Sequence, residues 1–247
     1  RQGELVIITG GTGLGKTSVV RELEHWLLNK TEDNIGIVAL EESLERTADG
    51  VLSIEANQRL YIDDIRKKFG TENYLKVSEK VLGGDNENRL WIYSHFGAND
   101  VDEILAKINH MIVGCDCRWI ILDHLHMIVS ASDEKNERAL IDRVMTKLRR
   151  LVEKTGAGLI LVSHLKRIEG NKGHEEGASA AISHLRGSGG IAHLADCVFT
   201  LERNQQAKDE KIAHRTRLKI LKSRYTGEVG IASYLQYDVN SGRLSEI

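Results

Sequence analysis

A glycine-rich octapeptide between an apolar run and a helical pattern constrains the fold of this chain most. Residues 10–17 read GGTGLGKT and fill every fixed position of the pattern G-x-x-x-x-G-K-[ST]. The preceding LVIITG predicts a buried strand, and the following TSVVRELEHWLL has helical spacing. This order is typical of a phosphate-binding P-loop, because backbone N–H groups converge on phosphate oxygens at the partly positive N-terminus of a helix.

The octapeptide predicts a nucleoside triphosphate site that contains Mg²⁺. We expect Lys16 to reach the β- and γ-phosphates and the Thr17 hydroxyl to bind the metal. Asp123 ends the apolar run RWIILD and is the predicted second metal ligand, although a carboxylate there also suits a plain helix cap. The residues predicted to surround the nucleotide phosphates are Gly10, Gly11, Thr12, Gly13, Leu14, Gly15, Lys16, Thr17 and Ser18.

Four continuous apolar runs, interleaved with helical patterns, predict an α/β fold. The runs cover residues 5–10, 35–41, 118–124 and 158–165, and their lack of alternation is typical of parallel strands covered on both faces. Three later runs, at 197–203, 216–224 and 230–238, predict an antiparallel meander. We therefore predict one domain over residues 1–247, with a mostly parallel twisted sheet flanked by helices and an antiparallel C-terminal meander.

The sequence lacks the signals of a membrane-spanning, secreted or disulfide-rich protein. It has no run of about 18 or more apolar residues and no visible signal or transit peptide. The first residue is Arg rather than Met, and we expect the chain to be an excised fragment. Cys115, Cys117 and Cys197 are too few for a four-ligand zinc site and favour a reducing, intracellular compartment. The net charge of −2 still permits a narrow basic stripe that binds nucleic acid.

Two further strand ends carry candidate catalytic groups. Glu41 ends the second run and Glu42 follows it, and ligands of such sheets bind at the carboxyl ends of the strands. Glu41 continues the strand and is the favoured water-orienting base, whereas Glu42 suits the start of the next helix. His164 ends the fourth run and is either a sensor of the γ-phosphate or a hydrogen-bonded structural histidine.

The segment from Lys166 to Gly190 is too long for a routine connection. It mixes cations with acidic residues, and its glycines allow a backbone to approach a ligand closely. A nucleic-acid phosphodiester is one such ligand, and the alternative is a solvated loop. The cations in question are Lys166, Arg167, Lys172 and Arg186, and the glycines are Gly187, Gly189 and Gly190.

Near the C-terminus, Lys222 and Arg224 follow Leu218 and Ile220 at every second position, so they point the same way at the end of a predicted strand. Exposed cations at such a place are usually solvated. Lys16 already supplies the cation for this chain's own triphosphate. The pair is therefore better explained as reaching the triphosphate of a second copy of the chain.

Together these motifs resemble the helicase domain of phage primase-helicases. That group includes the mitochondrial helicase Twinkle and lies within the DnaB-like hexameric ring helicases, which have a RecA-like core. The resemblance covers essentially the whole chain in order. It rests on GGTGLGKT, LEES, IILDH, SHLK, HEEG, LRGSGG, LERNQQ and ILKSRYTGEVGIA.

The resemblance implies a helicase that translocates 5′ to 3′ on single-stranded DNA as a hexameric ring, driven by hydrolysis of ATP or dTTP with Mg²⁺ at subunit interfaces. Glu41 would be the water-activating base, His164 the γ-phosphate sensor, and Arg224 the arginine finger for a neighbouring subunit, with Lys222 beside it. Arg203 and Tyr237 would sandwich the nucleobase. The DNA-contacting residues would be Lys166, Arg167, Lys172, Arg186, Gly187, Ser188 and Gly189.

The resemblance also sets expectations beyond this domain. The primase half and the linker helix of such proteins have no counterpart in these residues, and a replicative polymerase and a primase domain on the full-length chain are the further expected partners. The expected location is the cytoplasm of a bacterial or phage-infected cell, or an organellar matrix. His193 stands where relatives usually carry glutamine. Two alternative functions remain, a small-molecule P-loop kinase and a RecA-like protein that uses the nucleotide only as a switch.

Overall fold

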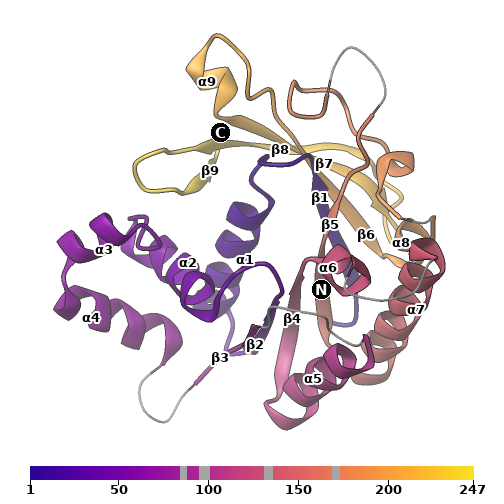
Figure 1. Ribbon diagram of the computed structural model, residues 1–247, viewed down its shortest axis with the longest axis horizontal. Coiled ribbons are helices and arrows are strands. Elements are labelled where there is room, and N and C mark those ends of the chain that lie inside the picture. The colour runs from indigo at the N-terminus through magenta and orange to yellow at the C-terminus, as the bar shows by residue number, and fades with distance from the viewer. Residues whose placement is uncertain (84–87, 95–100, 131–135, 169–172, 188) are drawn as a thin grey trace.

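The computed structural model describes residues 1–83, 88–94, 101–130, 136–168, 173–187 and 189–247. Lys172 and Ser188, two of the predicted DNA-contacting residues, lie outside these ranges. Figure 1 shows strands of the sheet running through the molecule between two groups of helices.

The described strands form one sheet in the order β3-β2-β4-β5-β1-β6-β7-β8-β9. Neighbours from β3 to β6 are parallel, and β6 to β9 pair antiparallel, so the predicted parallel core and antiparallel C-terminal meander are confirmed. The strands are β1 (Leu5–Gly10), β2 (Asn34–Ala39), β3 (Leu90–Ser94), β4 (Cys117–Asp123), β5 (Gly158–His164), β6 (Cys197–Glu202), β7 (Arg215–Ser223), β8 (Gly230–Tyr237) and β9 (Leu244–Glu246).

The longest helix, α7, shows how local sequence sets the helices. The Asn136 side chain accepts a hydrogen bond from the Ala139 N–H at its start, and Gly156 ends it with a left-handed φ of 71°. The helices are α1 (Lys16–Lys30), α2 (Leu44–Ala56), α3 (Asp63–Phe69), α4 (Thr71–Leu82), α5 (Val101–Gly114), α6 (Leu125–Ser130), α7 (Glu137–Thr155), α8 (Gly189–Leu194) and α9 (Glu210–Ala213), with a 3-10 turn at Ile182–His184.

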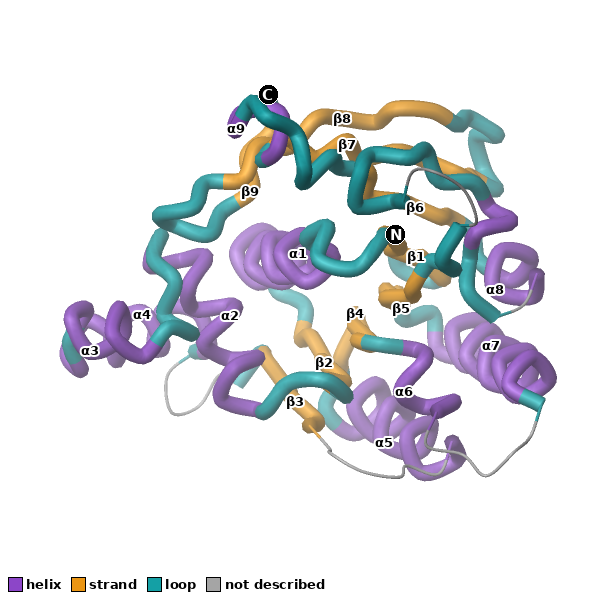
Figure 2. The backbone as a smooth tube through the Cα atoms, turned by 45° about the horizontal axis from the view of Figure 1, so that its top comes forward, coloured by secondary structure: helices purple, strands orange, loops and turns teal. Residues whose placement is uncertain are grey.

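Helices cover both faces of the parallel strands, and each face has its own hydrophobic core. Along β1, Leu5 and Ile7 enter the core under α5 to α8, whereas Ile8 enters the core under α1, α2 and α4. This alternation follows from the two-residue period of a strand. Figure 2 shows α1 and α2 on one side of β2 and β4, with α5 and α6 on the other.

The second strand is shorter than predicted. β2 ends at Ala39, and Leu40 and Glu41 lie beyond it. The chain leaves the sheet there because it turns into α2, whose first turn is capped by the Ser43 hydroxyl, which accepts from the Arg46 N–H. Glu41 therefore lies on a loop above the sheet edge rather than on the strand itself.

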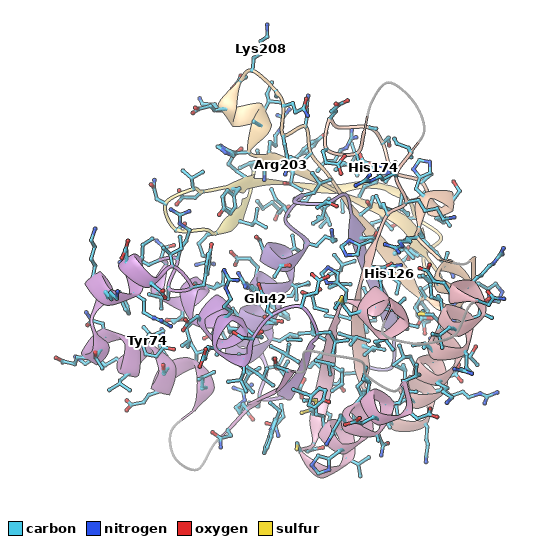
Figure 3. All side chains as sticks on the ribbon, in the orientation of Figure 1. Glu42, Tyr74, His126, His174, Arg203 and Lys208 are labelled. Carbon is cyan, nitrogen blue, oxygen red and sulfur yellow. The ribbon has the colours of Figure 1, made fainter. Side chains whose placement is uncertain are left out.

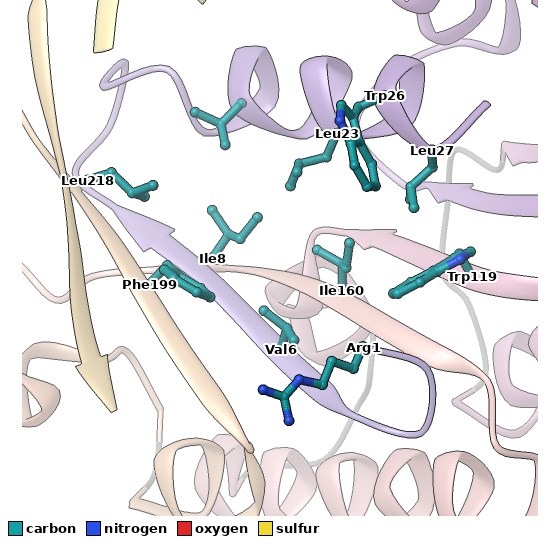
Figure 4. Close-up of a pocket in the computed structure, with 11 residues that line it drawn as sticks. Arg1, Val6, Ile8, Leu23, Trp26, Leu27, Trp119, Ile160, Phe199 and Leu218 are labelled. Atoms are coloured by element: carbon teal, nitrogen blue, oxygen red, sulfur yellow. The ribbon is translucent and has the colours of Figure 1, made fainter. Parts of the chain in front are cut away.

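The core under α1 is incompletely filled. An apolar cavity of about 280 Å³ lies between α1 and the sheet, lined by side chains that include Trp119 and Phe199 (Figure 4). Trp26, on the same helical face as Leu23 and Leu27, stands at this cavity with 54% of its surface exposed. None of the residues predicted to bind phosphate lines it. Among the described residues, no helix has the length and apolar character that crossing a membrane requires.

Candidate nucleotide-binding site

The glycine-rich loop joins β1 to α1 in the predicted strand, loop and helix order. Gly13 and Gly15 have φ values of 71° and 93°, which only glycine adopts at little cost. The Lys16 ammonium folds back over the loop and donates to the carbonyl oxygens of Gly10 and Gly11, at 3.1 and 2.9 Å. The loop thus has a buried cation at its centre, and burial lowers the pKa of Lys16.

The arrangement of the two predicted metal ligands, Thr17 and Asp123, is compatible with a bound magnesium ion. Thr17 and Asp123 line one cavity of about 20 Å³, room for a single ion or water molecule. Within the described residues, Asp123 Oδ1 is buried and has no hydrogen-bond partner, although His124 Nδ1 lies 3.0 Å away in poor geometry. Buried carboxylate oxygens seldom stay unpaired, and hydroxyl and carboxylate oxygens are the ligands that Mg²⁺ prefers.

The two acidic residues after β2 have different partners. Glu41 Oε2 lies 2.9 Å from His124 Nδ1, and Glu41 Oε1 lies 3.9 Å from His164 Nε2. Glu42 also lines the cavity of Thr17 and Asp123, but both of its carboxylate oxygens accept hydrogen bonds from Arg21. Of the two acids, Glu42 is thus bound by an arginine and Glu41 is not. This difference suits the role of water-orienting base predicted for Glu41.

Three histidines gather at the carboxyl ends of β4 and β5. The ring of His164 stacks on that of His124, with centroids 4.3 Å apart, and His126 lies 5.7 Å from His164. Burial lowers the pKa values of His126 and His164 to about 4, so both rings are neutral at pH 7. Sequence reasoning predicted only His164. The signal for His124 was its position directly after Asp123 at the same strand end.

A third carboxyl group, Glu24 on α1, lines the cavity of Thr17 and Asp123. It is 3% exposed, and burial raises its pKa from an ordinary 4.5 to about 8. In this pH window the folded chain holds a proton that the unfolded chain has released. The contribution of Glu24 to stability must therefore fall as the pH rises from 4.5 towards 8.

We expect Glu24→Gln to remove the contribution of Glu24 to the pH dependence. The variant should gain stability over the wild type as the pH rises, by at most about 1.4 kcal/mol per pH unit, because the amide needs no proton to stay neutral. Urea unfolding of both proteins from about pH 5 to pH 8 measures the difference. Glu32→Gln, at an exposed acid, is the matched control. Parallel stability curves for Glu24→Gln and wild type would contradict the raised pKa.

The segment at residues 173–177, which contains the HEEG motif, packs on the P-loop. A Cβ on Gly11 would lie 2.9 Å from His174 Cβ, so only glycine fits there. Gln205, from the LERNQQ motif, donates from Nε2 to the Gly13 carbonyl oxygen at 2.5 Å. Sequence reasoning assigned no role to His174, which is labelled in Figure 3, or to Gln205.

A cleft of about 400 Å³ joins the tip of the P-loop to the predicted DNA-contacting segment. Its lining includes Gly11 and Thr12 on one side and Lys166 and Arg167 on the other. The two predicted DNA-contacting stretches also meet, because Lys166 N–H donates to the His184 carbonyl and Arg186 N–H to the His164 carbonyl. The Arg186 side chain lies 3.5 Å from Glu137, and Gly187 has a φ of 109°.

Arg203 and Tyr237, the predicted nucleobase pair, come together at the same sheet edge as the P-loop. The Arg203 guanidinium carbon lies 6.0 Å from the centre of the Tyr237 ring. The strand register explains the placement, because Leu201 on β6 lies opposite Gly10 on β1. Arg203 also donates from Nε to the carbonyl oxygen of Ala213.

Lys222 and Arg224 lie at the opposite edge of the sheet. Ser223 pairs with Cys197, which pairs with Val6 at the start of β1, about 13 Å along the strand from Gly10. Arg224 donates to Asp196 Oδ1 at 2.8 Å and to the His193 carbonyl at 3.0 Å. The structure places Lys222 and Arg224 next to each other, but far from the P-loop of their own chain.

The C-terminal end of α8 holds both cations. Lys222 Nζ donates to the carbonyl oxygens of Ala192, His193 and Ala195 at 2.7, 3.2 and 2.7 Å. The His193 ring, which replaces the expected glutamine, is exposed. Asp196 is fully buried and also accepts from the Leu5 N–H at 2.8 Å. Lys222 and Arg224 thus have defined partners within their own chain.

Comparisons with known proteins agree with this geometry. Residues 1–245 match the model of the DnaB-like helicase C terminal domain family. The chain is 37% identical over 245 residues to the DNA helicase/primase of Enterobacteria phage T3, covering 99% of this chain and 42% of the relative. It is 22% identical over 236 residues to the replicative DNA helicase DnaC of Bacillus subtilis, covering 94% and 50%. The chain therefore spans half or less of the length of these curated relatives.

Solved structures share the fold. A DnaB-like replicative helicase, whose structure was solved together with its interactions with primase, superposes with a TM-score of 0.78 at 19% identity, covering 99% of this chain and 59% of that chain. A KaiC-like protein of Pyrococcus horikoshii gives 0.65 at 17% identity, covering 100% and 90%. The predicted RecA-like α/β fold is thus confirmed, and the chain belongs to the DnaB-like helicase C-terminal domain family.

Proposed function

We propose that this chain is the NTP-hydrolysing motor domain of a replicative DNA helicase. The observation that carries the proposal is that the P-loop, Asp123, Glu41 and His164 meet at one sheet edge. The names of the phage T3 and Bacillus relatives support the same function. One sheet joins all the described strands, which supports a single domain over residues 1–247.

Each side chain at this edge has a distinct task in the proposed hydrolysis. The P-loop N–H groups and Lys16 hold the phosphates, and Thr17 and Asp123 hold Mg²⁺. The bound ion would neutralise charge on the phosphate oxygens. Glu41 orients the attacking water and takes its proton, while the neutral His164 donates to the γ-phosphate. Arg203 and Tyr237 would stack on the base of ATP or dTTP. Stacking alone does not favour one of these two bases over the other.

The completed site needs a second copy of the chain. Arg224 lies at the sheet edge opposite its own P-loop, so it could reach a triphosphate only in a neighbouring subunit. We therefore propose a closed ring, six-membered as the resemblance implies, with Lys222 beside Arg224 at each interface. Closed rings follow from head-to-tail contacts of this kind.

Single-stranded DNA is the proposed polymer in the ring. Lys166 and Arg167 are exposed at the cleft that reaches the P-loop, and Arg186 is bonded through its backbone to His164. Movement of the DNA-contacting turn would therefore shift His164 and change its contact with the γ-phosphate. The helicase/primase name of the phage relative supports a primase domain on the full-length chain, and a replicative polymerase is a further proposed partner. The phage and bacterial sources support a cytoplasmic site of action.

Turnover of ATP and dTTP with and without single-stranded DNA tests this function. We expect hydrolysis to rise manyfold when the DNA is added, because DNA contacts and the γ-phosphate sensor share backbone bonds. A small-molecule kinase would instead transfer phosphate to an acceptor and ignore the DNA. A nucleotide switch would bind NTP without rapid turnover. Either of these results would overturn the proposal.

The basic side chains at the cleft should set the salt dependence of DNA binding. We expect Lys166→Ala with Arg167→Ala to weaken binding and to lower the slope of log K against log salt by about 1.4, since each phosphate contact to a single strand contributes about 0.7. Fluorescence anisotropy with a labelled oligonucleotide at several salt concentrations measures it. The matched control is Lys67→Ala with Lys68→Ala on α3, where both cations are exposed. An unchanged slope at the cleft would favour the solvated-loop alternative.

A further inference from the structure

Glu41, His124 and His164 offer one ligand atom each within a small volume. The three atoms all lie within 4.8 Å of one another. Glu41 approaches the two rings through different oxygens, with Oε2 2.9 Å from His124 Nδ1 and Oε1 3.9 Å from His164 Nε2. Three ligands on one tetrahedral zinc ion, with bonds of about 2.0–2.2 Å, lie about 3.3–3.5 Å apart. The observed separations bracket that spacing. The stacked His164 ring must turn to face an ion, and its side chain is 26% exposed, which leaves it room to do so.

The His124 ring points an unsatisfied nitrogen at this volume. Its side chain is 5% exposed, and within the described part of the chain Nδ1 has no hydrogen-bond partner, despite lying 2.9 Å from Glu41 Oε2. The two atoms are close, but their angle is wrong for a hydrogen bond. An unpaired buried polar atom costs stability, and coordination to an ion would satisfy it.

The chemistry of the donors differs from that of the Mg²⁺ site. Thr17 and Asp123 offer oxygen ligands, whereas two of the three donors here are imidazoles. Imidazole suits Zn²⁺, Ni²⁺ and Cu²⁺, while Mg²⁺ keeps to oxygen ligands and water. Burial keeps His164 neutral at pH 7, so its lone pair is available to a metal. Asp123, beside His124, adds negative charge that partly offsets the nearby Lys16.

We propose that Glu41, His124 and His164 form a second metal site, which binds a divalent transition ion such as Zn²⁺ through two imidazoles and one carboxylate. Three protein ligands leave a fourth position for water. This site shares no ligand with the proposed Mg²⁺ site, although the two adjoin where Asp123 Oδ1 lies 3.0 Å from His124 Nδ1. An ion bound here would occupy the carboxylate and the imidazole that the proposed hydrolysis uses.

The consequence for activity rests on the proposed function. With Zn²⁺ bound, Glu41 no longer orients water and His164 no longer contacts the γ-phosphate, so turnover stops. Nucleotide affinity should change little, because the P-loop and Lys16 still hold the phosphates. The ion would therefore act as an inhibitor that traps the chain with NTP bound.

Metal binding is measured without nucleotide, so its result is independent of the proposed function. Zn²⁺ is titrated into the purified chain in excess Mg²⁺ against a chromogenic chelator, and Co²⁺ serves as a spectroscopic probe. We expect one ion per chain that excess Mg²⁺ does not displace. The Co²⁺ complex should show visible d–d bands without a thiolate charge-transfer band, which would exclude Cys115 and Cys197 as ligands.

Variants identify the ligands. Glu41→Gln and His164→Asn change partly exposed side chains and should each weaken Zn²⁺ binding by more than about 100-fold, since even outer-shell partners contribute about 10–100-fold. His124→Asn tests the buried ligand, with a thermal melt in chelator to check its fold. The control is His25→Asn, which alters a histidine 2.8 Å from Glu55 at another place and should leave binding unchanged.

Two results would overturn the proposal. If Glu41→Gln and His164→Asn bind Zn²⁺ as wild type does, the ion is held elsewhere as an adventitious ion only. If the chain binds no Zn²⁺ at all, the cluster is an internal contact in which His124 simply packs against Glu41. In both cases the NTP hydrolysis test of the proposed function stands unaffected.

Discussion

Arg224→Ala is expected to lower NTP hydrolysis by about 10³–10⁵-fold while the variant still folds and binds NTP. The guanidinium lies at the sheet edge opposite its own P-loop, so its loss leaves every phosphate ligand of that chain in place. In the proposed ring, the variant would lose the positive charge that meets the transition state in a neighbouring subunit. Steady-state turnover and equilibrium binding of a fluorescent nucleotide separate the two effects.

Mixing experiments show whether Arg224 acts on a neighbour. Rings assembled from Arg224→Ala and Lys16→Ala chains contain some interfaces that pair an intact P-loop with an intact arginine. We expect such mixtures to regain part of the turnover that each variant lacks alone. Arg118→Ala, at another exposed arginine, should leave turnover unchanged. Mixed rings that form and stay inactive would contradict a finger acting between subunits.

The fold was largely predictable because its signals are local. Continuous apolar runs marked β1, β2, β4 and β5, since strands buried on both faces need apolar side chains at every position. The helical period and Gly156 marked α7 and its end. The short elements α6, α8, α9 and β9 were missed, because six residues or fewer are too short to show a periodic pattern.

The P-loop edge of the site was predictable for a related reason. Lys16, Asp123, Glu41 and His164 each end or follow a parallel strand, and the carboxyl ends of parallel strands share one edge. Each assignment needed only a local motif and that rule. Their functional roles stay predictions until the variants described above are measured.

The rest of the site depended on contacts between distant segments. The binding of Lys222 and Arg224 to the end of α8 follows from the antiparallel register of β6 and β7, which no local pattern encodes. The packing of His174 on Gly11 links residues far apart in the chain. The close approach of His124 to Glu41 depends on where the chain goes after β2 ends at Ala39.

Lys16→Ala is expected to abolish NTP hydrolysis and to weaken nucleotide binding. Removing one neutral hydrogen-bond donor from a charged transition state costs about 10²–10³-fold in rate, and a buried ammonium that meets the phosphates directly should cost at least that much. In the structure the ammonium donates to the Gly10 and Gly11 carbonyls of the P-loop itself. Turnover and nucleotide titration measure both effects.

The loss should come from the missing charge rather than from unfolding. Burial opposes the charged form of Lys16, as its lowered pKa shows, so alanine relieves the desolvation of an ammonium while it removes two hydrogen bonds. The thermal midpoint without nucleotide should therefore move little, whereas the rise in midpoint on adding NTP should vanish. Lys30→Ala, at the exposed far end of α1, should keep both turnover and that rise. Normal turnover by Lys16→Ala would contradict the P-loop assignment, because no other described cation bonds to the loop carbonyls where Lys16 lies.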